Sequence, residues 1–232
     1  IKEYSNIHLI KANFSNFIYP KVSFVKDNHE QSIESNFLVG ADGLRSPLRK
    51  VLGIKSKKPK FKRWAMTAHM AIKPWTNLVE IYLNNFVEAY ITPTGPEEIN
   101  IVLMWAPDDF SPAKGPELFF NLLKNFPELY KRLGRQHLSH KAHAIGPFHH
   151  RVRDFFIDNH AALVGDAAGY IDPLTGEGIN LGVFSGRLLA QIIGRKLVDG
   201  QGPSLMDLKN YQKKALKHGQ AHAILTYSLL KL

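Results

Sequence analysis

The chain has 232 residues, 44% of them hydrophobic, and a formal net charge of +10. This length and composition predict a globular protein with one sizeable core or two smaller ones, and they disfavour a disordered chain. Because the sequence has no cysteine, disulfides, thiolate catalysis and cysteine-ligated metal sites are excluded. No apolar run reaches the length that spans a bilayer, and the start of the chain lacks the pattern of a signal peptide, so we expect a cytoplasmic protein.

Short β-prone segments separated by turn-forming residues occupy the first part of the chain. We expect strands in three of them, the last of which ends at Gly40: 7–14, 21–27 and 35–40. Residues 64–106 continue in the same style, with a turn in TPTGPEE. This second stretch therefore predicts a mostly antiparallel sheet.

A basic run follows the first strands. Nine Lys and Arg and no acid lie from Arg45 to Arg63. Pro47, Gly53 and Pro59 break the run into short pieces, and no recognised nucleic-acid motif accompanies it. We interpret it as a solvated connector and expect no nucleic-acid partner, and a module that binds nucleic acid or a membrane surface through this run is the alternative.

Helical periodicity begins at Pro116. The pattern predicts a helix that Pro127 interrupts or restarts and that ends at Gly134. Later, a long helix is expected to start within residues 176–180 and to stop near Gly200. The last helix, 205–232, is expected to pack over the core as an amphipathic helix, and the sequence leaves dimerisation and peripheral membrane contact open as alternatives.

Two tracts have the same pattern, in which an apolar strand ends in glycine and an aspartate follows among very small residues. They are 37–43, with Asp42, and 162–169, with Asp166. In open α/β sheets, ligands bind beyond the carboxyl ends of the strands, where a carboxylate can accept hydrogen bonds from sugar hydroxyls. A turn or a helix cap is the ordinary alternative for each aspartate. Together, the tracts favour a site for a nucleotide-like cofactor.

The loop after the second tract strengthens this interpretation, because it opens a long helix. The first-turn N–H groups of a helix lack internal partners and favour an electron-rich group. This helix also carries three glycines four residues apart: Gly178, Gly182 and Gly186. Glycines at this spacing permit close contact with a flat ring or with another backbone.

These stretches resemble a known family. FLVGADGLRSPLRK resembles the Asp-Gly motif, G-A-D-G-x-x-S-x-x-R, of the flavoprotein monooxygenases typified by aromatic hydroxylases, and ALVGDAAGYIDPLTGEGIN resembles their Gly-Asp motif and P-x-x-G-x-G-x-N loop. The resemblance spans about residues 1–200. It implies a mixed α/β, three-layer FAD/NAD(P)-binding fold with an inserted, mostly antiparallel substrate domain. The implied divisions are 1–58 and 151–202 for the FAD-binding domain, 59–150 for the substrate domain, and 203–232 for a C-terminal helix.

The resemblance also implies functional roles. Asp166 would accept hydrogen bonds from the ribityl or linker part of FAD, and the loop after it would pass beside the flavin ring. For Arg49, two roles stay open: a contact to an anion or a charge on the surface. The implied cofactor-binding residues are Asp42, Gly43, Arg45, Gly165, Asp166, Pro173, Gly176, Glu177, Gly178, Ile179 and Asn180.

The chain also departs from the family pattern. The Gly-x-Gly-x-x-Gly fingerprint is absent and the first methionine is Met66, so we expect an N-terminal portion to be missing and FAD to bind weakly. Gly169 stands where many hydroxylases have histidine. The run 165–178 is also similar to geranylgeranyl reductases and quinone-linked flavoproteins, whereas the Trp-x-Trp-x-Ile-Pro motif of halogenases is absent.

The sequence therefore predicts an FAD-dependent oxidoreductase with NAD(P)H as co-substrate. A monooxygenase of a small apolar or aromatic molecule is the first hypothesis, a C=C reductase or quinone-linked dehydrogenase the second, and a non-catalytic remnant the third. Aromatic and Met residues of the predicted sheet are candidates for lining a substrate pocket or for the core: Trp64, Met66, Tyr82, Tyr90 and Trp105. A cluster of histidines has no metal-ligand spacing, so no metal is expected: His137, His140, His143, His149, His150 and His160.

Overall fold

The computed structural model describes residues 4–57, 63–106, 115–134, 138–148 and 150–229. The chain forms two compact units: unit 1 combines residues 1–58 with 150–232, and unit 2 comprises residues 59–149. The fold is mixed α/β, as the sequence predicts. Within the described ranges, no helix is both long and apolar enough to cross a membrane.

Unit 1 begins with an antiparallel three-stranded meander: β1 (Asn13–Ile18), β2 (Lys21–Lys26) and β3 (His29–Glu34). Residues 7–12 of the first expected strand are not in a strand. Strand β3 lies between the segments named from the sequence, because all six of its side chains are exposed and its sequence HEQSIE lacks the alternation that marks a half-buried strand. The missed signal is the β2–β3 turn, where Asp27 and Asn28 both have positive φ, 50° and 61°.

The two glycine–aspartate tracts of unit 1 come together in one sheet. Strand β4 (Leu38–Gly40) lies parallel to β13 (Ala161–Leu163), and β12 (Phe156–Ile157) pairs with the other edge of β13. Gly40 is opposite Leu163, and a Cβ at Gly40 would lie 2.7 Å from the Leu163 Cδ2 atom. Because the strands are parallel, Asp42 and Asp166 both follow strand ends at the same edge of the sheet.

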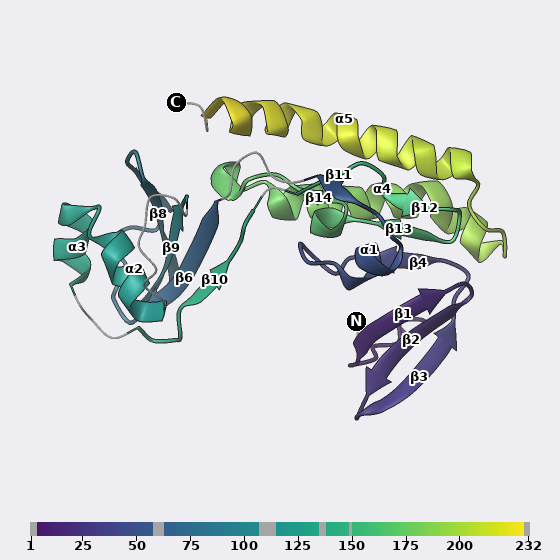
Figure 1. The fold of residues 1–232 in the computed structure, drawn as a ribbon. Helices are drawn as coiled ribbons and strands as arrows, with labels where there is room; N and C mark the ends of the chain where they lie inside the picture. Colours follow the sequence, from purple (N-terminus) through teal and green to yellow (C-terminus); the bar gives the residue numbers. More distant parts are fainter. Residues whose placement is uncertain (1–3, 58–62, 107–114, 135–137, 149, 230–232) are drawn as a thin grey trace. The chain divides into compact units, whose positions relative to one another are not determined.

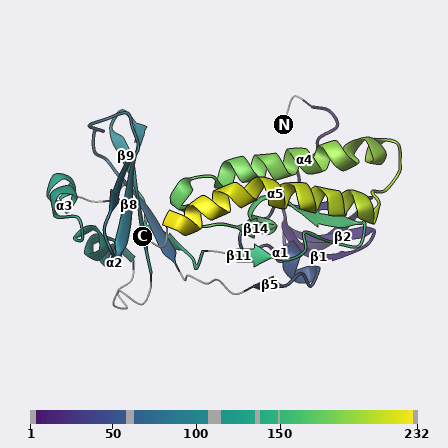
Figure 2. The same ribbon diagram turned by 90° about the horizontal axis from the view of Figure 1, so that it is seen from above.

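Helices complete unit 1. The short α1 (Pro47–Val51) follows β4, and two long helices, α4 (Gly178–Val198) and α5 (Leu205–Leu229), lie side by side (Figures 1 and 2). Figure 1 shows the meander on the opposite side of β4 and α1 from these helices. The helix bounds confirm the predicted stop near Gly200 and the final helix. The remaining elements are β5 (Ser56–Lys57), β11 (His150–Val152), β14 (Gly169–Tyr170) and the 3₁₀ turns η2 (Gly165–Ala167) and η3 (Pro173–Thr175).

Unit 2 is an antiparallel sheet with helices on one face, which confirms the predicted sheet and the helix break at Pro127. The strand order is β10-β6-β9-β8-β7, and the helices α2 (Gly115–Leu123) and α3 (Pro127–Leu133) pack on it. The strands are β6 (Trp64–Met70), β7 (Glu80–Leu83), β8 (Val87–Gly95), β9 (Glu98–Trp105) and β10 (His143–Ile145).

The strand register decides which candidate pocket residues face the core of unit 2. Met66 and Trp105 belong to the buried cluster under α2 and α3, and Trp64 and Tyr82 pack against that cluster. Tyr90 follows the fully buried Ala89, so it points to the other face of the sheet. Four of the five candidates are therefore core or core-edge residues, and Tyr90 is the exception.

Two residues correct the interpretation of the basic run as a solvated connector. Arg49 is 7% exposed, and Arg63, with an 11% exposed side chain, forms an ion pair with Glu88 at 2.6 Å. Of the clustered histidines, His137 and His149 lie outside the described residues. Within the described ranges, no three His, Cys, Asp or Glu residues form a group that could hold a metal ion.

Candidate functional site

The turn after β13 is built around a glycine. Gly165 has a φ of 55°, and its N–H donates to the Ser185 Oγ atom at 2.9 Å. Gly182 of α4 lies next to this turn, and its Cα would be in ordinary van der Waals contact, at 3.5 Å, with a Cβ at Gly165. Glycine is therefore favoured here by the left-handed conformation. A Cβ at Gly182 would lie 3.8 Å from the Gly165 Cα, and nothing lies within 4 Å of the Cβ position of Gly186, so neither distance requires glycine.

Asp166 follows this glycine with a half-buried carboxylate. Burial raises the pKa of Asp166, and within the described residues no hydrogen bond to its side chain is formed. Tyr170 lies nearby, and its pKa is raised by burial and then by the charges of Asp166 and Asp172. A desolvated carboxylate without a donor is costly, so this group is suited to a ligand that brings hydroxyl donors.

The loop between Asp172 and α4 leaves the start of the helix open. Asp172 accepts a hydrogen bond from the Leu174 N–H at 3.1 Å and thereby shapes η3. Glu177, at the N-cap of α4, makes no side-chain hydrogen bond to the helix backbone, and it instead accepts from the Asn180 side-chain amide at 2.9 Å. The first-turn N–H groups therefore remain suited to an anionic or electron-rich ligand group.

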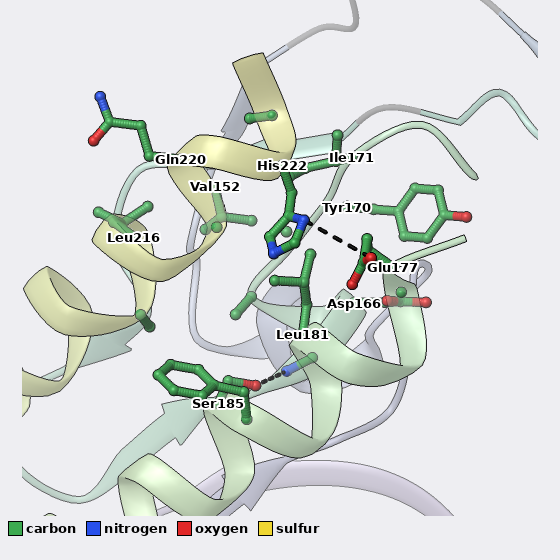
Figure 3. A pocket seen from close by; sticks show the side chains of 18 of the residues that line it. Val152, Asp166, Tyr170, Ile171, Glu177, Leu181, Ser185, Leu216, Gln220 and His222 are labelled. Carbon is green, nitrogen blue, oxygen red and sulfur yellow. Dashed lines mark hydrogen bonds and ion pairs between the residues drawn. The ribbon is translucent and has the colours of Figure 1, made fainter. Parts of the chain in front are cut away.

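A cavity of about 940 Å³ connects these elements inside unit 1, and Figure 3 shows it. Among the residues implied for cofactor binding, four line it: Gly165, Asp166, Glu177 and Gly178. The others do not: Asp42, Gly43, Arg45, Pro173, Gly176, Ile179 and Asn180. The structure thus places the Gly-Asp turn and the helix start around one space, whereas the Asp-Gly motif follows the neighbouring strand end and does not line that space.

Helix α5 forms a wall of this cavity that no motif in the sequence signals. His222 Nδ1 lies 3.9 Å from Glu177 Oε1, and Figure 3 shows the two side chains facing each other. The hydroxyls of Thr226 and Thr175 are hydrogen-bonded at 3.0 Å. These contacts join the second half of α5 to the loop before α4. Sequence reasoning missed them because they connect residues about 50 positions apart.

The Asp-Gly motif has a structural role. Asp42 accepts a hydrogen bond from the Leu48 N–H at 2.9 Å, so its carboxylate caps α1. Arg49 donates to the backbone carbonyls of Ala167 at 3.0 Å and Leu44 at 2.8 Å. Burial lowers the pKa of Arg49, and the Asp42 charge counteracts this. Both expectations for Arg49 are therefore wrong: the buried guanidinium bonds the Asp-Gly tract to the Gly-Asp turn.

Two parallel strands with glycine and aspartate at their carboxyl ends, beside an open helix start, are typical of α/β proteins that bind a cofactor. Residues 13–225 match the FAD binding domain family. The chain belongs to this family of FAD-binding oxidoreductases.

Similar proteins differ in reaction. An uncharacterized Synechocystis protein is 28% identical over 84% of this chain and 47% of its own length. A ubiquinone biosynthesis monooxygenase of Caenorhabditis elegans is 23% identical over 84% of this chain and 51% of its own length. A geranylgeranyl diphosphate reductase of Arabidopsis thaliana is 40% identical over 36% of this chain and 18% of its own length. The chain thus spans about half the length of the first two. A variant of the flavin-dependent brominase Bmp2 shares the fold, with a TM-score of 0.83 at 19% identity over 94% of this chain and 59% of that chain.

Proposed function

We propose that this chain provides the flavin-contacting elements of an NAD(P)H-linked, FAD-dependent monooxygenase of a small apolar or aromatic substrate. The observation that carries the FAD assignment is Asp166, a half-buried carboxylate with a raised pKa and no hydrogen-bond donor within the described residues. It lies in a cavity beside the start of α4. The family match supports the cofactor, and the similarity to the ubiquinone biosynthesis enzyme supports the reaction.

The residues of the cavity fit the cofactor. Asp166 would accept hydrogen bonds from its hydroxyls, and Gly165 would leave room for it next to the backbone. The amides that begin α4 at Gly178 would favour negative charge. When bound, FAD supplies the redox chemistry, and the protein provides placement and exclusion of water.

A test of the cofactor assignment compares Asp166→Asn with Asp154→Asn, which changes an exposed carboxylate that does not line the cavity. FAD binding is measured by quenching of flavin fluorescence. Loss of a charge-assisted hydrogen bond is expected to weaken binding by roughly 10- to 100-fold in Asp166→Asn, and the control is expected to bind as the parent does. Equal affinity of both variants, or no binding by the parent protein, would refute the assignment.

The same variant has a readout that does not need flavin. Because burial raises the pKa of Asp166 in the folded state, ionising this carboxyl costs stability as the pH rises above its ordinary value of 3.8. Asp166→Asn removes this cost. The cofactor-free variant is therefore expected to unfold at higher urea concentration than the parent at neutral pH, and the two are expected to converge in acid.

A reductase of carbon–carbon double bonds is the second candidate, because the local identity to the geranylgeranyl diphosphate reductase reaches 40% over 90 residues. Oxidation of NAD(P)H by the flavin-loaded protein, with and without dioxygen, separates the two. A monooxygenase consumes dioxygen and yields a hydroxylated product. A reductase turns over a substrate alkene without dioxygen, and that result would replace the first candidate.

A further inference from the structure

One exposed face of α5 combines lysines with large apolar side chains. We call it the α5 outer face, and its exposed members recur at three- and four-residue spacing: Met206, Lys209, Lys213, Leu216, Lys217, Gln220 and Ile224. Residues at this spacing lie along one side of a helix. Figure 1 shows α4 beside α5. Five members of the face also line the cavity that residues of α4 line: Lys213, Leu216, Lys217, Gln220 and Ile224.

The charge of this face is entirely positive. From residue 208 to the end of the chain there is no Asp or Glu. The acid before it, Asp207, is engaged by Lys196 at 2.6 Å on the other long helix. No ion pair is formed by Lys209, Lys213 or Lys217 within the described residues. The face therefore carries uncompensated cations available to an anionic surface.

The apolar side chains of the same face are large and accessible. Met206 is 72% exposed, Leu216 47% and Ile224 60%. A nucleic-acid surface would leave these side chains in water, since its backbone contacts are made by cations and polar groups. A second copy of this chain, docked by twofold symmetry, would bring lysines against lysines. Neither occupant matches both the charge and the apolar side chains.

We propose that α5 docks this protein on a membrane surface that carries anionic phospholipids. A helix lying in the membrane interface inserts apolar side chains at the headgroup boundary, and lysines beside them keep their charged ends at the anionic headgroups. Met206, Leu216 and Ile224 provide the apolar contact, and Lys209, Lys213 and Lys217 provide the electrostatic attraction. The contact runs along the surface of the bilayer.

The position of the α5 outer face suggests a role for membrane contact in the delivery of substrate. Five residues of the α5 outer face are exposed and also line the cavity that contains Asp166: Lys213, Leu216, Lys217, Gln220 and Ile224. A bilayer bound at the α5 outer face therefore lies at the edge of the candidate flavin site, and an apolar substrate dissolved in the bilayer reaches the cavity without crossing water. This use rests on the proposed function, whereas the docking itself does not.

The test is sedimentation of the cofactor-free protein with vesicles of phosphatidylcholine containing phosphatidylglycerol, and with vesicles of phosphatidylcholine alone. Binding is expected to the anionic vesicles and to fall with added salt. Replacing Lys213 and Lys217 with Gln is expected to lower the partition coefficient about 30-fold, at about fivefold for each lysine. The matched control replaces Lys21 and Lys26, two exposed lysines of β2, with Gln.

The apolar contribution is tested with Ile224→Ser against Val198→Ser, because Val198 is an 87% exposed apolar residue of α4 outside this face. Ile224→Ser is expected to weaken vesicle binding severalfold and Val198→Ser to leave it unchanged, with circular dichroism showing that all variants are folded. Equal binding to both kinds of vesicle, or equal losses in control and α5 variants, would overturn the proposal. So would a concentration-dependent dimer that Ile224→Ser abolishes, or salt-sensitive DNA binding with no vesicle binding. Failure to bind FAD would leave the docking result unaffected.

Discussion

Replacing Arg49 with Met tests whether the two motif tracts are held together by a buried guanidinium. Met keeps an apolar stem of similar length and removes the donors to the Ala167 and Leu44 carbonyls, at 3.0 and 2.8 Å. Hydrogen bonds to a charged group contribute about 1.5–3 kcal/mol each. Because burial lowers the pKa of Arg49, part of this gain offsets desolvation. We expect the free energy of unfolding to fall by about 2–4 kcal/mol.

Urea unfolding followed by circular dichroism measures this change, with Lys50→Met as the control at an exposed neighbouring position of α1. Arg49→Lys keeps the charge but loses the planar fork that reaches both carbonyls, so it is expected to lose at least half as much stability as Arg49→Met. If Arg49→Met is no less stable than Lys50→Met, the guanidinium is not a structural link, and the reasoning is wrong.

Other variants test packing, hydrogen bonding and pH dependence. Gly40→Ala places a Cβ 2.7 Å from Leu163 Cδ2 and is expected to cost about 1–3 kcal/mol in urea unfolding. Tyr211→Phe removes the buried hydroxyl that donates to the Leu163 carbonyl at 2.8 Å and is expected to cost about 1–2 kcal/mol in the same assay. Hydrogen bonding, first from Lys196, lowers the pKa of Asp207 to about 2, so its stabilisation is present above pH 3.8 and lost toward pH 2. Asp207→Asn is expected to flatten the pH dependence of stability across that interval.

For each of these variants, a matched control or a specific result would contradict the expected effect. Gly202→Ala adds a Cβ with no atom within 4 Å, so an equal loss of stability in Gly202→Ala and Gly40→Ala would contradict the steric argument. A Tyr211→Phe variant as stable as the parent would mean that water replaces the lost donor. An unchanged pH profile in Asp207→Asn would show that other carboxyl groups govern acid unfolding.

The candidate site was predictable where a local pattern carries chemistry. The apolar strand, the glycine and Asp166 are adjacent in sequence, and the structure places them at a strand end, beside an open helix start and within a cavity. Arg49 was also visible as part of a motif, but its role was not, because its partner Ala167 lies 118 residues further along the chain. The His222 contact with Glu177 had no sequence signal for the same reason.

The sequence by itself determined the family, the two motif tracts, the antiparallel sheet and the positions of the long helices, because these follow from local spacing and turn chemistry. Only the tertiary structure decided which face of a sheet each side chain lies on and which distant residues it contacts. Strand register placed Trp105 in the core and Tyr90 on the opposite face of the sheet, since successive side chains alternate between faces. Packing decided that Arg49 is a buried link and that α5 closes a wall of the cavity, because burial and long-range hydrogen bonds depend on which distant segments meet.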